Sequence, residues 1–466
     1  MVNNMPGWLW FLIQFLLIGG FFAYIIVSSK KAIAEGRTTW FMKSWQKDSV
    51  KSVASSLISI ICGLLIGATI LLIMALIPTK GVNLTFKSFM EGVQLIFSGV
   101  FNTGRTDGGG LKFGFNPKLF GDMLFTATPL ILTGLSVAVA FKTGLFNIGA
   151  PGQYLMSTAT TLILALSIPT TVVPPLLVWI IAFLGGILIA ALWGAIPGLF
   201  KAHLNVNEVI TCIMTNWIAA NLVTLVFDKE VGWFKHLLDP SGTKNLAYVF
   251  KTTLNNVATS KFGLDKIFAG SQVNGGIIIA ILIAIVVYVV LNKTTFGYQL
   301  KACGSNKNAS KYAGISDKTC TVISMAIAGG LAGAGAALYY LSGNTEFAWE
   351  TYQSLPAVGF NGIPVALLGC NNPLGVIFSA IFVSLLDTNG MQLKWMTSYN
   401  EYITSIITAV IVYFSAFSLL FKQVLSGKTK INFNKILKFE KSKTIETVEQ
   451  PIDSVAEEVI KEEESK

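Results

Sequence analysis

The stretch from Thr143 to Phe200 decides the fold, and it reads T-G-L-F-N-I-G-A-P-G-Q-Y-L-M-S-T-A-T-T-L-I-L-A-L-S-I-P-T-T-V-V-P-P-L-L-V-W-I-I-A-F-L-G-G-I-L-I-A-A-L-W-G-A-I-P-G-L-F. Its 58 residues include no Asp, Glu, Lys or Arg. A helix that crosses a bilayer needs about 20 apolar residues. The stretch therefore predicts two membrane spans, separated at Pro169, Pro174 and Pro175.

The same pattern of uncharged runs extends over most of the chain. Eight further runs occur, at 1–29, 52–79, 123–141, 209–227, 267–292, 319–345, 351–386 and 402–421. The run at 351–386 holds two short spans that are split near Asn371, Asn372 and Pro373. The sequence therefore predicts an all-α, polytopic membrane protein with eleven spans.

Composition excludes several other classes of protein. Apolar residues make up 53% of the 466 residues and charged residues only 12%, against roughly 25% charged in soluble domains. This excludes an extended disordered chain and a series of soluble domains. The net charge of +10 comes from basic residues in loops between the apolar runs, and not from a basic stripe, so nucleic acid is not an expected partner.

The basic residues also predict an orientation. Six lysines and arginines lie between Lys30 and Lys51, directly after the first run. The positive-inside rule places this segment in the cytoplasm, the N-terminus outside and, after eleven crossings, the C-terminus inside. From residue 422 onward, acidic and basic residues are interspersed, which predicts a disordered cytoplasmic tail.

The chain lacks the motifs of an ATPase or a metalloenzyme. The G-K-T at Gly427 has Lys422 where a P-loop needs its first glycine, and no H-E-x-x-H occurs. No nucleotide or metal cofactor is therefore expected in this chain. Its spans also show no charged residue near a predicted midplane, although proton-coupled carriers usually have one. Amides and hydroxyls remain, and they suit a polar, uncharged solute.

Two stretches are expected to break helices at membrane depth. G-L-F-N-I-G-A-P-G-Q, from Gly144 to Gln153, holds three glycines, a proline and two amides. V-G-F-N-G-I-P-V-A-L-L-G runs from Val358 to Gly369. Broken backbone is tolerated there only inside protein or along a cavity, and it often marks a transporter's binding site. Close helix packing is the alternative interpretation.

The connection after the seventh span is longer than a simple turn requires. Ser305 or Asn306 is expected to cap a short helix whose small apolar face would be Ala309, Tyr312 and Ala313, and which would end at Gly314. Such a helix, with an exposed tyrosine, is typical of a docking element. A plain solvated turn is the alternative.

Four motifs in one order carry a resemblance to a known family. They are G-L-F-N-I-G-A-P-G-Q, N-V-N-E-V-I-T-C-I-M-T-N-W-I-A, G-S-N-K-N-A-S-K-Y-A-G-I and G-F-N-G-I-P-V-A-L-L-G-C-N-N-P-L-G. Together they closely resemble the permease subunits of bacterial ABC importers for nucleosides and simple sugars, nearest the nucleoside branch. The match covers about residues 52–421.

The resemblance implies a complex in the bacterial plasma membrane. The permease would have about ten helices, so that residues 1–51 would add one N-terminal helix and a basic cytoplasmic linker, and 422–466 a tail. Its implied partners are a second homologous permease subunit, a cytoplasmic ATP-binding subunit that uses ATP and magnesium, and an extracellular substrate-binding lipoprotein. The chain itself would be a non-catalytic transport subunit embedded in lipid.

The resemblance also implies roles for particular residues. The segment 293–318 would couple to the ATPase through Ser305, Asn306, Ala309, Tyr312, Ala313 and Gly314. The translocation pathway would include Asn147, Gln153, Asn207, Glu208 and Asn216, and the second expected break adds Phe360 and Asn361. For Glu208, an alternative is a purely structural place at a helix start capped by Asn207.

Other functions stay open at this point. A simple-sugar importer would share all four motifs. A stand-alone carrier driven by sodium through neutral oxygen ligands needs no buried charge. A membrane enzyme or sensor is disfavoured because no cluster of nucleophile, base and acid is present. The residues do not identify the nucleoside or sugar, the role of the first helix, or whether two identical permeases or two different ones pair.

Overall fold

The computed structural model describes residues 27, 48–76, 86–228, 230–237, 246–248, 257–399, 402–417, 421 and 423. The predicted first span at 1–29 and nearly all of the basic linker and of the charged tail lie outside the described residues.

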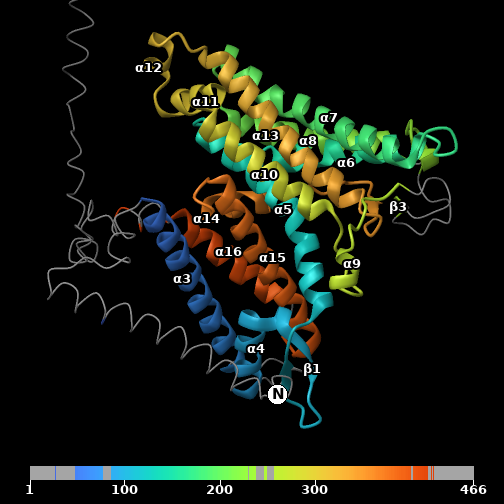
Figure 1. Ribbon diagram of the computed structural model, residues 1–466, viewed down its shortest axis with the longest axis vertical. Coiled ribbons are helices and arrows are strands. Elements are labelled where there is room, and N and C mark those ends of the chain that lie inside the picture. The colour runs from blue at the N-terminus through green and yellow to red at the C-terminus, as the bar shows by residue number, and fades with distance from the viewer. Residues whose placement is uncertain are drawn as a thin grey trace, which may run out of the picture. The chain divides into compact units, whose positions relative to one another are not determined.

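Helices dominate the described part of the chain (Figure 1). They are α3 (Asp48–Leu76), α4 (Phe86–Ser98), α5 (Pro117–Lys142), α6 (Ala150–Ser167), α7 (Pro175–Leu204), α8 (Glu208–Val226), α9 (Leu264–Ile267), α10 (Gly276–Lys293), α11 (Thr295–Ser305), α12 (Lys307–Tyr312), α13 (Asp317–Tyr340), α14 (Ala357–Leu368), α15 (Pro373–Met396) and α16 (Tyr402–Ala416), with the 3-10 turns η2 (Gly99–Phe101) and η3 (Lys235–Leu237). Two short antiparallel pairs join β1 (Asn102–Arg105) to β2 (Leu111–Phe113) and β3 (Leu246–Tyr248) to β4 (Phe347–Trp349).

Seven of the described helices have the length and apolar composition needed to cross a membrane, namely α3, α5, α7, α8, α10, α13 and α15. The helices α6, α14 and α16 occupy the remaining uncharged stretches beyond residue 51, as the sequence predicts. The prediction of an all-α, polytopic membrane protein is therefore confirmed.

Side-chain caps mark where several of these helices begin. Asn116 accepts a hydrogen bond from the backbone N–H of Leu119 at the start of α5, over 3.2 Å. Asn372 does the same for Leu374 at the start of α15, over 3.1 Å. Each amide satisfies a backbone donor that the first helical turn leaves unpaired. At the other end of α7, Asn205 adopts a left-handed conformation, with φ at 52°, and stops the helix.

The second expected break is wrong in its position. Residues 358–368 are helical within α14, with Pro364 inside the helix, and the chain turns only at 369–372. Cys370 and Asn371 both have a φ of 53° there. The prediction of two short spans is also half wrong, because α15 continues for 24 residues, through Asp387 to Met396.

Small residues let α7 and α13 approach closely. The buried positions of α7 recur at every fourth residue, as Val178, Ala182, Gly186, Ala190, Gly194 and Gly198. On α13, a Cβ added to Gly329 would lie 2.3 Å from the carbonyl oxygen of Ala190. A Cβ added to Gly333 would lie 2.4 Å from the Cβ of Ala190. This is the small-residue packing typical of membrane helices, which associate through van der Waals contact.

The helix α5 lies between two groups of helices. It contacts α13, which packs with α6 and α7, and it also contacts α14 and α15, next to α16 and α3 (Figure 1). The short helices α11 and α12 lie at one end of the spans, and α4 and β1 lie at the other (Figure 1). There Arg105 pairs with Glu91 over 3.1 Å and donates to the carbonyl of Met396, which ties the β1–β2 hairpin to α4 and α15.

Candidate functional site

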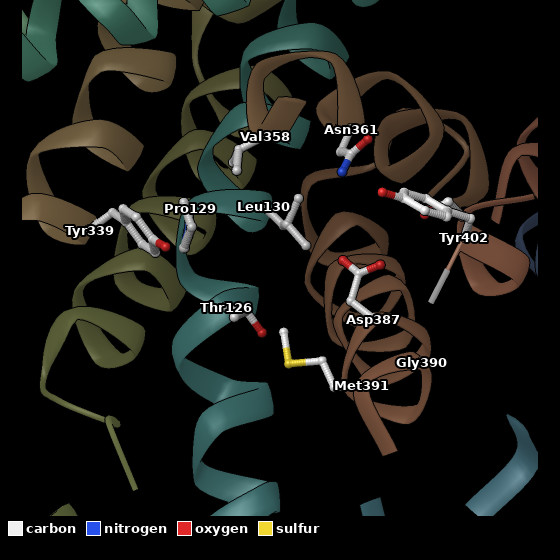
Figure 2. Close-up of a pocket in the computed structure, with 11 residues that line it drawn as sticks. Thr126, Pro129, Leu130, Tyr339, Val358, Asn361, Asp387, Gly390, Met391 and Tyr402 are labelled. Atoms are coloured by element: carbon white, nitrogen blue, oxygen red, sulfur yellow. The ribbon is translucent and has the colours of Figure 1, made fainter. Parts of the chain in front are cut away.

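A cavity of about 380 Å³ lies among α5, α13, α14, α15 and α16. Its volume falls in the range of small-molecule sites, roughly 300–1,000 Å³. Figure 2 shows the residues that line it, which are Thr126, Pro129, Leu130, Tyr339, Val358, Asn361, Asp387, Gly390, Met391, Tyr402 and Ser405. Polar groups and apolar walls therefore meet in one partly open space that five helices line.

Two of the polar groups have no partner among the described residues. The carboxylate of Asp387 and the amide of Asn361 face the same space from α15 and α14 (Figure 2). Neither side chain forms a hydrogen bond or an ion pair within the described part of the chain. Among the described residues that line the cavity, Asp387 is the only charged one, and no Lys, Arg or His is present. The cavity thus offers free acceptors and donors to a solute.

The prediction that no charge lies near the middle of a span is wrong because of Asp387. This residue lies near the middle of the 24-residue helix α15. Sequence reasoning ended each span at the first charged residue, which placed the end of the run at 386. The stretch L-L-D-T-N-G-M-Q-L-K-W-M has no proline, and its continued helical character was the signal that could have revealed Asp387.

The walls of the cavity are held by contacts between helices. The hydroxyl of Thr126 on α5 lies against that of Ser384 on α15, and Ser384 Oγ donates to the carbonyl of Met123 over 2.6 Å. The ring of Tyr339 stacks on that of Phe125, with ring centroids 5.3 Å apart. These contacts fix α5 against α15 and α13, and therefore fix the width of the cavity.

Of the predicted pathway residues, Asn361 alone lines this cavity. Phe360, its neighbour on α14, is partly exposed but is not among the lining residues. The other five are Asn147, Gln153, Asn207, Glu208 and Asn216, and they lie elsewhere in the described part of the chain.

Three of these five form a buried network at the junction of α5 and α6. Asn147 Nδ2 donates to Gln153 Oε1 over 2.8 Å, and Gln153 Nε2 donates back to Asn147 Oδ1 over 3.1 Å. Asn216 accepts from the N–H of Gly152 and donates to the carbonyl of Ile148. The geometry gives these amides a bracing role around the predicted first break, which does separate α5 from α6. Solute contact at these residues stays a prediction.

We expect Asn147→Leu to destabilise the protein without changing its choice of solute. The substitution leaves Ser136, Gln153 and Gly149 without hydrogen bonds that Asn147 now provides. Each unsatisfied buried group costs about 1–3 kcal/mol. The measurement is membrane abundance and thermal unfolding in detergent, together with uptake per unit of membrane protein.

Thr160→Val is the matched control, because Thr160 donates only to the carbonyl of Met156 in its own helix, over 3.0 Å. It should keep wild-type abundance. An Asn147→Leu protein with normal abundance and an altered order of preferred solutes would place this amide on the pathway instead.

The remaining two predicted pathway residues lie at the start of α8. Asn207 caps this helix by accepting from the N–H of Val209 over 2.9 Å. Glu208 pairs with Lys201 of α7 over 3.1 Å. The cap satisfies a backbone donor and the ion pair joins two helix ends, so both arrangements stabilise the start of α8. A pathway role for either residue stays a prediction.

The segment after α10 contains the expected short helix, α12. Asn306 caps it by accepting from the N–H of Ala309 over 3.0 Å, whereas Ser305 is the last residue of α11. The expected apolar face, Ala309, Tyr312 and Ala313, is exposed, and Tyr312 is 94% exposed. Gly314 follows with a φ of 76°. An exposed tyrosine on a short capped helix is available to a partner.

This segment rests on the junction of α5 and α6. Gly304 in α11 lies so close to that loop that an added Cβ would be 2.6 Å from the carbonyl oxygen of Lys142. From the other side, a Cβ on Gly144 would be 2.9 Å from the carbonyl oxygen of Gly304. The backbone of α11 is therefore in close contact with the junction that Asn147 braces.

Comparison with known proteins places these features in a family. Residues 119–416 match the model of the permease component of the branched-chain amino acid transport system. The chain belongs to this permease family of ABC transporters, and it is a multi-pass membrane protein and a transport subunit. Permeases of this kind work with an ATP-binding subunit and a substrate-binding partner.

Three relatives illustrate the range of the family. A nucleoside ABC transporter permease protein of Lactococcus lactis is 33% identical over 81% of this chain and 94% of its own length. A guanosine ABC transporter permease protein of Bacillus subtilis is 33% identical over 80% and 95%. A glucose ABC transporter permease protein of Haloferax volcanii is 29% identical over 66% and 78%.

Proposed function

We propose that this chain is the permease subunit of an ATP-driven nucleoside importer and forms half of its translocation pathway. The observation that carries the proposal is the cavity lined by Asp387 and Asn361, which have no partner in the described part of the chain. The chain is 33% identical to nucleoside and guanosine permeases over about four fifths of its length. The cavity's solute would pass between α5, α14 and α15.

The chemistry of the cavity suits an uncharged solute with a ring and several hydrogen-bonding groups. Pro129, Leu130 and Met391 supply apolar surface for a base, and Asn361 offers both a donor and an acceptor. Asp387 adds two acceptor oxygens, and no basic side chain lines the cavity in the described part of the chain. A phosphate would meet the carboxylate with like charge and no cation, so nucleosides fit and nucleotides do not.

The proposal assigns a separate role to each subunit of the complex. A second homologous permease would complete the pathway, and a cytoplasmic ATP-binding subunit would hydrolyse ATP with magnesium. An extracellular lipoprotein would deliver the solute. We place the N-terminus outside and the C-terminus in the cytoplasm of a bacterial plasma membrane, so that α12 faces the ATPase. The exposed Tyr312 and the contact of Gly304 with Gly144 support this coupling role.

Competition for uptake tests the proposed solute class. In cells that depend on this complex, unlabelled purine and pyrimidine nucleosides should inhibit uptake of labelled guanosine, whereas nucleoside monophosphates should not. The measurement is initial uptake against a strain lacking this chain, with ribose and glucose as further competitors. Stronger inhibition by either sugar than by any nucleoside would favour a sugar importer.

A further inference from the structure

We propose that Asp387 selects solutes that present two adjacent hydrogen-bond donors, and that this carboxylate determines the specificity of the cavity. The inference rests on the proposed function, because it names the part of a nucleoside that the cavity recognises. Asp387 falls outside every span predicted from the sequence, because those spans end at charged residues.

The first step is that Asp387 needs a partner from outside the described chain. Burying a charged group is costly unless hydrogen bonds or an opposite charge compensate it. Asp387 is half-buried near the middle of α15, faces the cavity, and has no hydrogen bond or ion pair within the described residues. Ionisable groups inside a membrane span mark functional sites by default. The missing partner is therefore assigned to the solute.

The second step concerns the kind of partner. An ionised carboxylate has two oxygens and only accepts hydrogen bonds, so it pairs best with two parallel donors. A ribonucleoside presents such a pair in its 2′ and 3′ hydroxyls, and guanine presents another in its N1–H and 2-amino group. Carboxylates bind ribose hydroxyls in dinucleotide-binding folds and accept from base amino groups on DNA.

The third step is that the rest of the cavity can orient the solute without competing for Asp387. Asn361 projects from α14, and Tyr402 from α16, toward the same space (Figure 2). Neither side chain is a cation, and no described lining residue neutralises the carboxylate. A solute that offers two donors to Asp387 can therefore place its remaining polar groups near Asn361.

Asp387→Asn provides the test, because it keeps the size of the side chain and replaces one acceptor oxygen by a donor. The readout is uptake of guanosine, 2′-deoxyguanosine and inosine by the whole complex, per unit of permease in the membrane, with the same substrate-binding partner throughout. Guanosine uptake by the variant should fall about ten-fold to a hundred-fold at subsaturating concentration.

The other two solutes identify which donor pair is read. If Asp387 binds the ribose diol, the variant should lose inosine uptake as strongly as guanosine uptake, but lose 2′-deoxyguanosine uptake much less. If it binds the guanine edge, 2′-deoxyguanosine should be affected strongly and inosine much less. Either pattern supports the inference. An equal loss for all three solutes, or no loss for any, would overturn it.

Two further variants guard the interpretation. Asp265→Asn makes the same chemical change on the exposed helix α9, away from the cavity, and should leave all three uptake ratios at wild type. Asp387→Glu keeps the carboxylate, so it should preserve the order of preference among the three solutes even at a lower rate of uptake. A reversed order would count against the inference.

The failure of the proposed function and the failure of this inference give different results. A wild-type complex that carries no nucleoside would contradict the proposed function itself, whereas wild-type uptake ratios in Asp387→Asn would contradict only this inference.

Discussion

Gly329→Val is expected to remove nearly all folded permease from the membrane. An added Cβ would lie 2.3 Å from the carbonyl oxygen of Ala190 and 3.0 Å from the Cα of Gly194, and both are backbone atoms of α7. A backbone cannot turn aside as a flexible side chain can, so α7 and α13 must separate. We expect a cost at or above the roughly 3 kcal/mol upper end of typical overpacking. The measurement is the amount of monodisperse protein extracted in mild detergent.

Gly330→Ala is the matched control for this prediction. Its added Cβ would first meet the side chain of Ile187, at 3.4 Å, which is ordinary van der Waals contact. Alanine also favours a helix more than glycine does. The control should therefore be as abundant as wild type or more so. Normal abundance of Gly329→Val would show that α7 and α13 do not pack as described.

Tyr312→Ala and Gly314→Pro are expected to abolish coupled uptake while the protein still inserts. Tyr312 is the largest side chain on the exposed face of α12. Gly314 has a φ of 76°, and its N–H donates to the carbonyl of Lys311 over 3.0 Å. Proline lacks this N–H and fixes φ near −65°, so the end of α12 must rearrange. The measurement is uptake together with ATP hydrolysis by the assembled complex.

Tyr298→Ala removes an equally large side chain from α11, 68% exposed, without touching α12. It should transport like wild type. Wild-type uptake by both Tyr312→Ala and Gly314→Pro would instead show that α12 is a solvated surface helix with no docking role.

Hydropathy predicts the spans well because the bilayer imposes one length on every helix that crosses it. The long run from Thr143 to Phe200 divides into α6 and α7 near the prolines, as expected. The same rule fails at α15, since a helix that borders a cavity can carry a carboxylate such as Asp387 at membrane depth. Because the predicted span ends at Leu386, Asp387 is not predicted to lie at membrane depth.

The candidate site is less predictable than the fold, because side-chain direction depends on packing between distant segments. The motif around Asn147 and Gln153 is correctly identified as a helix break, but its amides bond to each other and to Ser136 rather than facing the cavity. Asn361 lines the cavity, although it lies in a continuous helix, and its place on the translocation pathway stays a prediction. The sequence identifies the amides near the helix break and Asn361 alike. The structure distinguishes the amides that bond to each other from Asn361, which has no partner among the described residues.

Reconstitution tests the proposed function most directly. The complex of this chain with its permease and ATP-binding partners would be placed in liposomes, with magnesium and ATP enclosed and the guanosine-loaded binding partner added outside. We expect labelled guanosine to accumulate against its gradient only when ATP is hydrolysed, and collapse of a sodium gradient to change nothing. Accumulation that follows the sodium gradient and needs no ATP would contradict an ATP-driven importer.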